Sequence, residues 1–168
     1  MKPQAMKFKQ LAVTFLAVVA LSLAHSAFAA PAVELLSKVE IDKVTINKDG
    51  TKETKRILAK KVAPDGEVIY TTTFKNTIDK PVGNIAITNA IPANMVYTAG
   101  SAEGENTSIT YSVDGGKAYN TAENLSVTGE DGKVRPALAS DYTHIRWAYK
   151  GDLVAGKAGS AVFRAKVK

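Results

Sequence analysis

The stretch APDGEVIYTTTFKNTIDKPVGNIAITNAIPANMVY, residues 63–97, decides the fold. From Val68 to Phe74, every second side chain is Val, Tyr, Thr or Phe, and Ile69 is the one apolar residue between them. This two-residue period is typical of a half-buried β-strand, and β-branched and aromatic residues favour a pleated surface. A Pro-Asp-Gly turn at 64–66 precedes the run. The stretch therefore predicts a strand that begins just after this turn.

A second strand is predicted after a polar turn at 76–81. Ile85 and Ile87 share one face, and Pro92 ends the run because proline lacks the N–H that a strand ladder needs. The clearest alternation comes later, at 143–149 and 161–167. We expect Trp147, the one tryptophan, to pack between two sheets; a position lining a sugar-binding groove is the alternative.

Upstream, residues 37–62 predict a β-hairpin. The apolar alternation from Val39 to Ile46 changes phase at 42–43, which predicts a bulge, and Asn-Lys-Asp-Gly at 47–50 predicts the turn. The return segment 51–62 carries five basic residues, which are Lys52, Lys55, Arg56, Lys60 and Lys61. We expect an edge strand whose lysines prevent edge-to-edge pairing. The alternative is a patch for an anionic polymer such as lipopolysaccharide.

Downstream of Tyr97, a loop is predicted at 98–107 and a hairpin at 109–119 around Asp-Gly-Gly at 114–116. Residues 120–141 predict a short edge strand and a long loop. Long loops often carry function, so this segment is the first place where we expect a binding surface.

An ordered series of turn, aromatic and apolar residues runs through the deciding stretch: Pro64, Asp65, Gly66, Tyr70, Asn76, Ile85, Ile87, Ile91, Pro92 and Tyr97. This order resembles the bacterial surface repeat domain called "domain of unknown function eleven". Asn89 departs from the Asp that is usual in that family, and Ile78 stands where a turn glycine is expected. The resemblance extends over 63–168 when the Asp-Gly-Gly turn and the His-Ile-Arg-Trp strand are included. It implies an immunoglobulin-like sandwich on an exported protein and implies little about activity.

Residues 1–29 predict a signal peptide. Lys2, Lys7 and Lys9 precede a mostly apolar run at 11–23, and Ala-Phe-Ala at 27–29 is a pattern that signal peptidase recognises. The apolar run is shorter than the roughly 20 residues of a membrane span, so we expect cleavage after Ala29 rather than an anchor. Residues 30–36 then form a flexible leader, 37–62 a hairpin that belongs to the sandwich, and 63–168 the immunoglobulin-like domain.

Charge and cysteine content exclude several classes of function. Three of the 22 basic residues and none of the 16 acidic residues lie in 1–29, so cleavage lowers the net charge from +6 to +3. A surplus this small does not indicate nucleic-acid binding. With no cysteine, the chain can form neither disulfides nor thiolate metal sites.

The residues that could carry chemistry are few. His144 is the one histidine after the signal, and no serine near it stands in a nucleophile motif, so we predict no catalytic residue. A zinc site would need more His or Cys residues than the chain has after the signal. The sequence also lacks the glycine-rich loop of a nucleotide-binding site. Five acidic residues fall in the loop-rich middle, but without the alternating spacing of a calcium loop, so no metal site is predicted; they are Asp114, Glu123, Glu130, Asp131 and Asp141.

The sequence therefore predicts an all-β fold, an immunoglobulin-like antiparallel β-sandwich preceded by a cleaved signal peptide. We expect a non-enzymatic structural or adhesion domain, periplasmic or secreted, without cofactor or stable membrane span, whose partner is an envelope or extracellular protein or glycan. A carbohydrate-binding module is the alternative, and Tyr119, Tyr142 and Tyr149 would then form an exposed platform. Donor-strand exchange of the pilus kind is not expected, because the pattern shows neither a surplus nor a missing strand.

Overall fold

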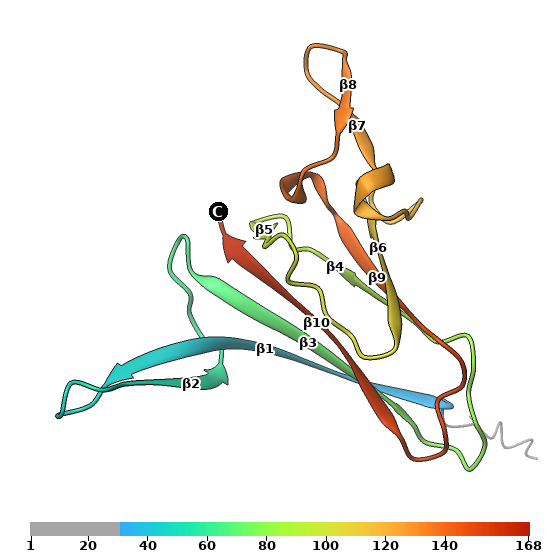
Figure 1. The fold of residues 1–168 in the computed structure, drawn as a ribbon, viewed down its shortest axis with the longest axis horizontal. Coiled ribbons are helices and arrows are strands. Elements are labelled where there is room, and N and C mark those ends of the chain that lie inside the picture. Colours follow the sequence, from blue (N-terminus) through green and yellow to red (C-terminus); the bar gives the residue numbers. More distant parts are fainter. Residues whose placement is uncertain (1–30) are drawn as a thin grey trace, which may run out of the picture. The chain divides into compact units, whose positions relative to one another are not determined.

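The computed structural model describes residues 31–168, and the strands in this part of the chain all pair antiparallel (Figure 1). The signal peptide predicted for 1–29, and Ala30 of the predicted leader, lie outside the described residues. Two sheets pack face to face, which confirms the predicted all-β antiparallel sandwich.

The larger sheet has five strands in the order β2-β1-β3-β10-β5. Their bounds are β1 (Val33–Ile46), β2 (Lys52–Leu58), β3 (Glu67–Asn76), β5 (Met95–Tyr97) and β10 (Ala158–Val167). The long strands β1, β3 and β10 form its centre, while β2 lies at one edge. The prediction that the lysine-rich segment is an edge strand is therefore confirmed.

The smaller sheet has three strands in the order β4-β9-β6, and a separate hairpin pairs β7 with β8. The remaining bounds are β4 (Ala86–Ala90), β6 (Thr107–Ser112), β7 (Ser126–Thr128), β8 (Val134–Pro136) and β9 (His144–Tyr149), with one-turn 3₁₀ helices η1 (Ala122–Asn124) and η2 (Ala139–Asp141). The predicted end of a strand before Ile91-Pro92 is confirmed, since β4 stops at Ala90.

The core lies where β3 and β10 face β9 and β4. Trp147, Phe74 and Phe163 are fully buried, and the Tyr70 ring stacks on Phe163 with the centroids 4.7 Å apart. The indole Nε1–H of Trp147 donates to the Glu103 carbonyl at 3.0 Å, so its polar atom is satisfied inside the core. Trp147 is thus the predicted core residue, and its alternative place in a sugar groove is wrong.

The turn predicted at 76–81 is confirmed and is organised by a buried asparagine. Asn76 donates from Nδ2 to the carbonyls of Lys80 and Leu153 at 2.7 and 2.8 Å, and its Oδ1 accepts from the Ile78 N–H at 3.0 Å. One side chain therefore closes the turn and ties it to the segment that precedes β10.

Strand β1 differs from the sequence prediction in two ways. It begins at Val33, so residues 33–36 of the expected flexible leader pair with β3 instead. The bulge predicted at 42–43 is absent, because the register with β2 runs without interruption from Glu40 to Ile46. The phase change arises because Val44 and Ile46 lie on the outer face of the sheet, where they are 55% and 68% exposed.

Two predictions about the second half of the chain are also corrected. The return strand expected near 118–119 is reduced to a single bridge between Tyr111 and Asn120, because the ladder partner of β6 is β9. The edge strand expected within 120–141 belongs to neither sheet of the sandwich. Instead, β7 and β8 pair with each other and form a hairpin that projects from the sandwich (Figure 1).

Replacing Trp147 with alanine tests the core. The substitution leaves a cavity between the sheets and removes one of the two hydrogen bonds that the Glu103 carbonyl accepts, the other coming from the Val162 N–H. We therefore expect a loss of about 3–5 kcal/mol in the free energy of unfolding. Urea denaturation followed by far-UV circular dichroism measures this loss. The control is Val154→Ala at a 57% exposed site, which should change stability by about 0.5 kcal/mol or less; equal losses for both variants would contradict the packing described.

Candidate interaction surface

The larger sheet is wider than the smaller sheet that covers it. Odd-numbered residues of β1 lie on the inner face, since Leu35 pairs with Phe74 and Val39 with Tyr70, both of which pack in or against the core. Phe74 is fully buried, but Leu35 is 58% and Val39 is 39% exposed. The cover provided by β4, β9 and β6 therefore ends before β1, and an apolar strip of the inner face is left open.

Three hollows follow this strip in order along β1. The first lies between Val33 and Leu35 and the segment 82–87, and the second between 37–39 and 88–90 of β4. The third, of about 940 Å³, is lined by Ile41, Lys43, Ile57, Leu58, Lys60 and Lys61. Inner-facing residues recur at every second position, so the three hollows lie in a row of about 33 Å along residues 33–43 of β1. We call this surface the β1–β4 trough.

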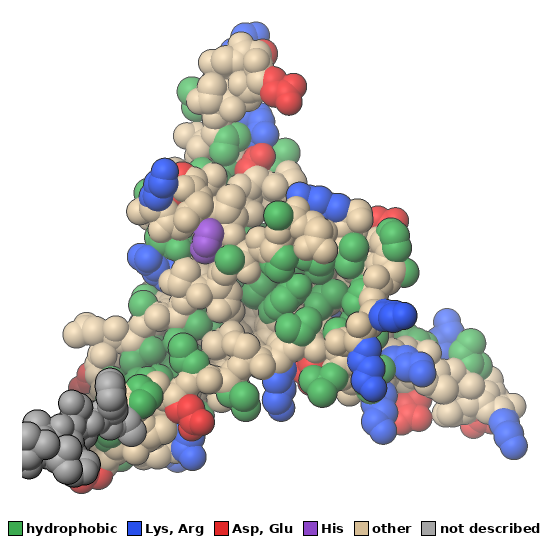
Figure 2. Space-filling model, turned by 180° about the vertical axis from the view of Figure 1, so that it is seen from behind, with side chains coloured by type: hydrophobic (Ala, Val, Ile, Leu, Met, Phe, Trp, Pro, Cys, Tyr) green, Lys and Arg blue, Asp and Glu red, His purple; other side chains and the backbone are tan. Residues whose placement is uncertain are grey.

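Hydrophobic side chains gather on the face of the domain shown in Figure 2, next to Lys and Arg side chains at the base of the projecting β1–β2 hairpin. The apolar row at this end of the trough is the cross-strand pair Ile41 and Ile57, both half-buried. A surface that combines such a row with exposed Leu35 and Val39 is suited to contact with another molecule.

Along the first two hollows, the trough is bordered by two free strand edges, those of β4 and of the first half of β1. The N–H of Tyr149 bonds the Ile85 carbonyl and the N–H of Ile91 bonds the Thr143 carbonyl, so odd-numbered residues of this segment face β9. Because bonding alternates along an antiparallel strand, the backbone groups of Ala86, Thr88 and Ala90 point away from β9. Among the described strands, β4 has no ladder neighbour on that side.

The same alternation applies to the first half of β1. Thr77 donates its N–H to the Ala32 carbonyl, so even-numbered residues face β3, and β2 pairs only from Glu40 onward. The backbone groups of Val33, Leu35 and Ser37 are therefore directed to the open side of β1. An extended segment placed in the trough would find donors and acceptors at the spacing of a β-strand on either wall.

A short polar network holds the middle of the trough. Asn89 of β4 donates from Nδ2 to the Thr72 hydroxyl at 3.0 Å, and this hydroxyl lies 3.2 Å from that of Ser37 on β1. Thr72 is 4% exposed, so the network links the two walls through a buried floor residue. These hydrogen bonds therefore fix the distance between β4 and β1 in the middle of the trough.

The third hollow is strongly basic. Lys43 lies directly opposite Lys55 on the inner face of the β1–β2 hairpin, and Lys60 and Lys61 line the same hollow as Lys43. Like charges directly opposite each other destabilise a strand pair. No ion pair among the described residues includes any of these four lysines. Glu53, opposite Thr45, is the one acidic residue of β1 or β2 on this face, so the inner face of the hairpin carries an excess of positive charge.

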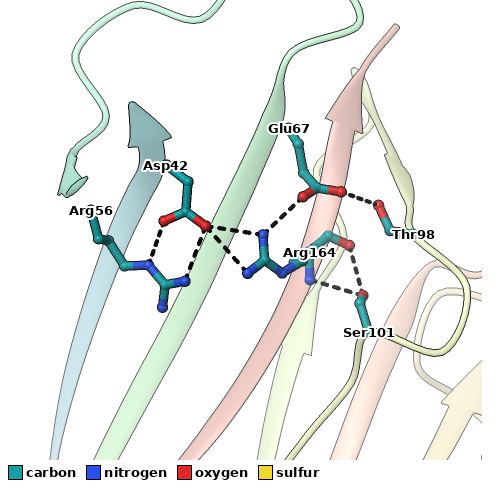
Figure 3. Close-up of polar contacts among 6 residues, drawn as sticks. All are labelled: Asp42, Arg56, Glu67, Thr98, Ser101 and Arg164. Atoms are coloured by element: carbon teal, nitrogen blue, oxygen red, sulfur yellow. Dashed lines mark hydrogen bonds and ion pairs between the residues drawn. The ribbon is translucent and has the colours of Figure 1, made fainter. Parts of the chain in front are cut away.

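The outer face of the same hairpin is arranged in the opposite way (Figure 3). Asp42 pairs with Arg56 at 2.8 Å and with Arg164 of β10 at 3.4 Å, and Arg164 also bonds Glu67 of β3 at 2.9 Å. This chain of charges crosses β2, β1, β3 and β10, and the Ser101 hydroxyl holds the backbone of Arg164 by accepting its main-chain N–H at 3.0 Å. It anchors the base of the hairpin to the centre of the sheet. The hydrogen bond from Arg56, supported by Arg164, lowers the pKa of Asp42.

The residues that the sequence singled out for chemistry lie elsewhere. His144 is half-buried, with its Nδ1 3.2 Å from the hydroxyl of its neighbour Thr143. Asp114 accepts the N–H groups of Lys117 and Ala118 in its turn, and Asp141 pairs with Arg135 at 2.7 Å. Within residues 31–168, no three His, Cys, Asp or Glu residues gather as a metal site. Local turn bonding thus accounts for Asp114 and Asp141.

The three tyrosines proposed as a glycan platform are all half-buried and have different partners. The Arg146 guanidinium lies 3.6 Å above the Tyr119 ring, Tyr142 stacks on Tyr111 at 4.6 Å, and Tyr149 meets Phe74 edge-on at 5.7 Å. These rings are committed to packing contacts rather than to one open aromatic face.

Comparison of the chain with protein-family models, with curated proteins and with solved structures finds no match. Within residues 31–168, no helix has the length and apolar character needed to span a membrane. The candidate site consequently rests on the geometry of the trough.

Asp42→Asn should lower the thermal unfolding midpoint at neutral pH, because it breaks the anchor between the hairpin and β10. The folded pKa of Asp42 is lowered, so the stability that its charge contributes is present above the unfolded pKa of about 3.9 and is lost as the pH falls through the folded value. The difference in midpoint between wild type and variant should therefore shrink below about pH 4.

Scanning calorimetry between pH 7 and pH 2.5 measures that difference. Asp79→Asn is the control, since it removes an exposed carboxylate that is in none of the ion pairs among residues 31–168. A difference for Asp42→Asn that stays constant across this range would contradict the ionic anchor.

Proposed function

We propose that this chain is an exported, non-enzymatic interaction domain of the bacterial envelope or surface, and that it binds an extended polypeptide segment in the β1–β4 trough. The observation that carries the proposal is the uncovered apolar strip of β1 between two free strand edges. Export is supported by the signal-like residues 1–29 and by the resemblance to the bacterial surface repeat domain.

A polypeptide fits the trough better than a purely apolar ligand. The walls offer backbone N–H and C=O groups from Ala86, Thr88 and Ala90, and only another backbone satisfies a row of these at strand spacing. The hydroxyls of Ser37 and Thr72 and the amide of Asn89 make the middle of the trough polar. An added strand could bond to this row with alternate side chains covering Leu35 and Val39.

Neighbouring leucines on β1 provide a matched test. Leu35 points into the trough and is 58% exposed, while Leu36 lies on the outer face and is 57% exposed. A photo-crosslinking amino acid placed at either position should leave the fold intact, since both side chains are largely in solvent. In intact cells, residue 35 is expected to capture a polypeptide partner and residue 36 is not.

The products are separated by gel electrophoresis and identified by mass spectrometry. Identical products from both positions, or none from position 35, would overturn the trough as the contact surface. A product from position 35 that glycosidases degrade and proteases spare would instead support the carbohydrate-binding alternative.

A further inference from the structure

The basic end of the trough restricts what can occupy it. Lys43, Lys55, Lys60 and Lys61 form a cluster without acidic partners among the described ion pairs, so the occupant must bring negative charge. Two copies that met trough to trough would leave these lysines without acidic partners, because no Asp or Glu lines the three hollows. A symmetric dimer through this surface is therefore disfavoured.

The same chain carries a projecting hairpin with two adjacent acidic residues in its turn, followed by the basic residues Lys133 and Arg135. The β7–β8 hairpin has no ladder with any other described strand, and Figure 1 shows it extending away from the two sheets and from the β1–β2 hairpin. Its turn contains Glu130 and Asp131, both exposed. Asp131 accepts the backbone N–H of Lys133 at Oδ1, and its one ion-pair contact among the described residues is a loose one of 3.7 Å with the Lys133 ammonium, whose side chain is 85% exposed. Such a contact contributes little, so the acidic tip is available to other cations.

The hairpin also has the apolar and backbone features of a strand donor. Val134 and Leu138 are 72% and 60% exposed, which is unusual for side chains of this size. Gly129 donates its N–H to the Lys133 carbonyl and Ala137 to the Leu125 carbonyl, so odd-numbered residues of the β7 segment face β8. The backbone groups of Ser126 and Thr128 point outward, with the same two-residue spacing as those of β4.

We propose that the β1–β4 trough of one copy receives the β7–β8 hairpin of a second copy, with Glu130 and Asp131 beside Lys43, Lys60 and Lys61. This inference rests on the proposed function, and it identifies the polypeptide partner of the trough as a second copy of the same chain. The two surfaces differ and lie on separate parts of the domain, so the contact is heterologous. Each bound copy still presents a free trough or a free hairpin, and the assembly therefore extends instead of closing as a dimer.

Sedimentation velocity of the purified protein lacking 1–29 tests the proposal. We expect species beyond the dimer as concentration rises, and weaker association as salt is added. Lys60→Glu with Lys61→Glu reverses the charge of the trough, and Glu130→Lys with Asp131→Lys reverses that of the hairpin. Each double variant should weaken association by about tenfold or more. Combining all four substitutions in one chain should restore it, because the reversed charges again match.

Lys117→Glu with Lys150→Glu is the matched control, because it makes the same change in net charge at two exposed positions outside both surfaces. It should associate as wild type does, and circular dichroism should show that every variant keeps its strands. A wild-type protein that stays monomeric, a closed dimer, or quadruple substitution without rescue would each overturn the inference.

Two results separate this inference from the proposed function. A monomeric protein whose residue 35 still captures other polypeptides in cells would reject self-assembly and leave the trough as a partner site. A monomeric protein that co-sediments with vesicles containing phosphatidylglycerol, and loses this binding on Lys60→Glu with Lys61→Glu, would reject it in favour of an anionic lipid.

Discussion

The structure depends on one strand that changes partners. Strand β1 pairs with β3 up to Glu40 and with β2 from Glu40 onward, so its first half belongs to the sandwich and its second half to a projecting hairpin. A strand of 14 residues cannot be covered by a sheet whose strands have five or six. The open strip of inner face, the free edge of β1 and the exposed hairpin all follow from this difference in length.

The core tolerates this arrangement because its fully buried aromatic residues belong to strands other than β1. Trp147, Phe163 and Phe74 are all fully buried, and they belong to β9, β10 and β3. These strands would bury most of the apolar surface whether or not the trough were filled, and hydrophobic stabilisation grows with the area removed from water. The trough is thus free to remain open in the isolated domain without loss of the fold.

Local patterns in the sequence were sufficient for the strands of the core but not for the trough. The alternation at 68–74 and around Trp147 reports which side chains face a core, because a strand repeats every two residues. The width of each sheet depends on pairings between distant segments, such as β1 with β3 and β10 with β5, and these leave no local signal. The phase change at 42–43 did carry information, since it marks where β1 leaves the sandwich, but a bulge produces the same pattern.

The same reasoning explains why the lysines of β2 could not be interpreted from the sequence alone. Lysines on an edge strand prevent unwanted pairing, and Lys52 and Lys55 fit that role by position. The cross-strand register shows which charges lie opposite each other, and composition cannot show this. Asp42 lies opposite Arg56 on the outer face, whereas Lys43 lies opposite Lys55 on the inner face. One hairpin thus pairs opposite charges on the side that anchors it and places like charges together on the side that borders the apolar strip.

Protection of an edge alone does not require that asymmetry, because lysines on either face would serve equally well. Two lysines directly opposite each other cost stability unless an anion lies between them. An apolar floor that leads into such a pair favours an occupant that is apolar along its length and acidic at one end. The β7–β8 hairpin and the residues after it combine both features, since Val134 and Leu138 are exposed and Glu130 and Asp131 lie in the turn, next to Lys133. The carboxylates of the hairpin turn are therefore complementary to the lysines of the trough, and this complementarity is the basis on which we propose assembly as a role of the lysines.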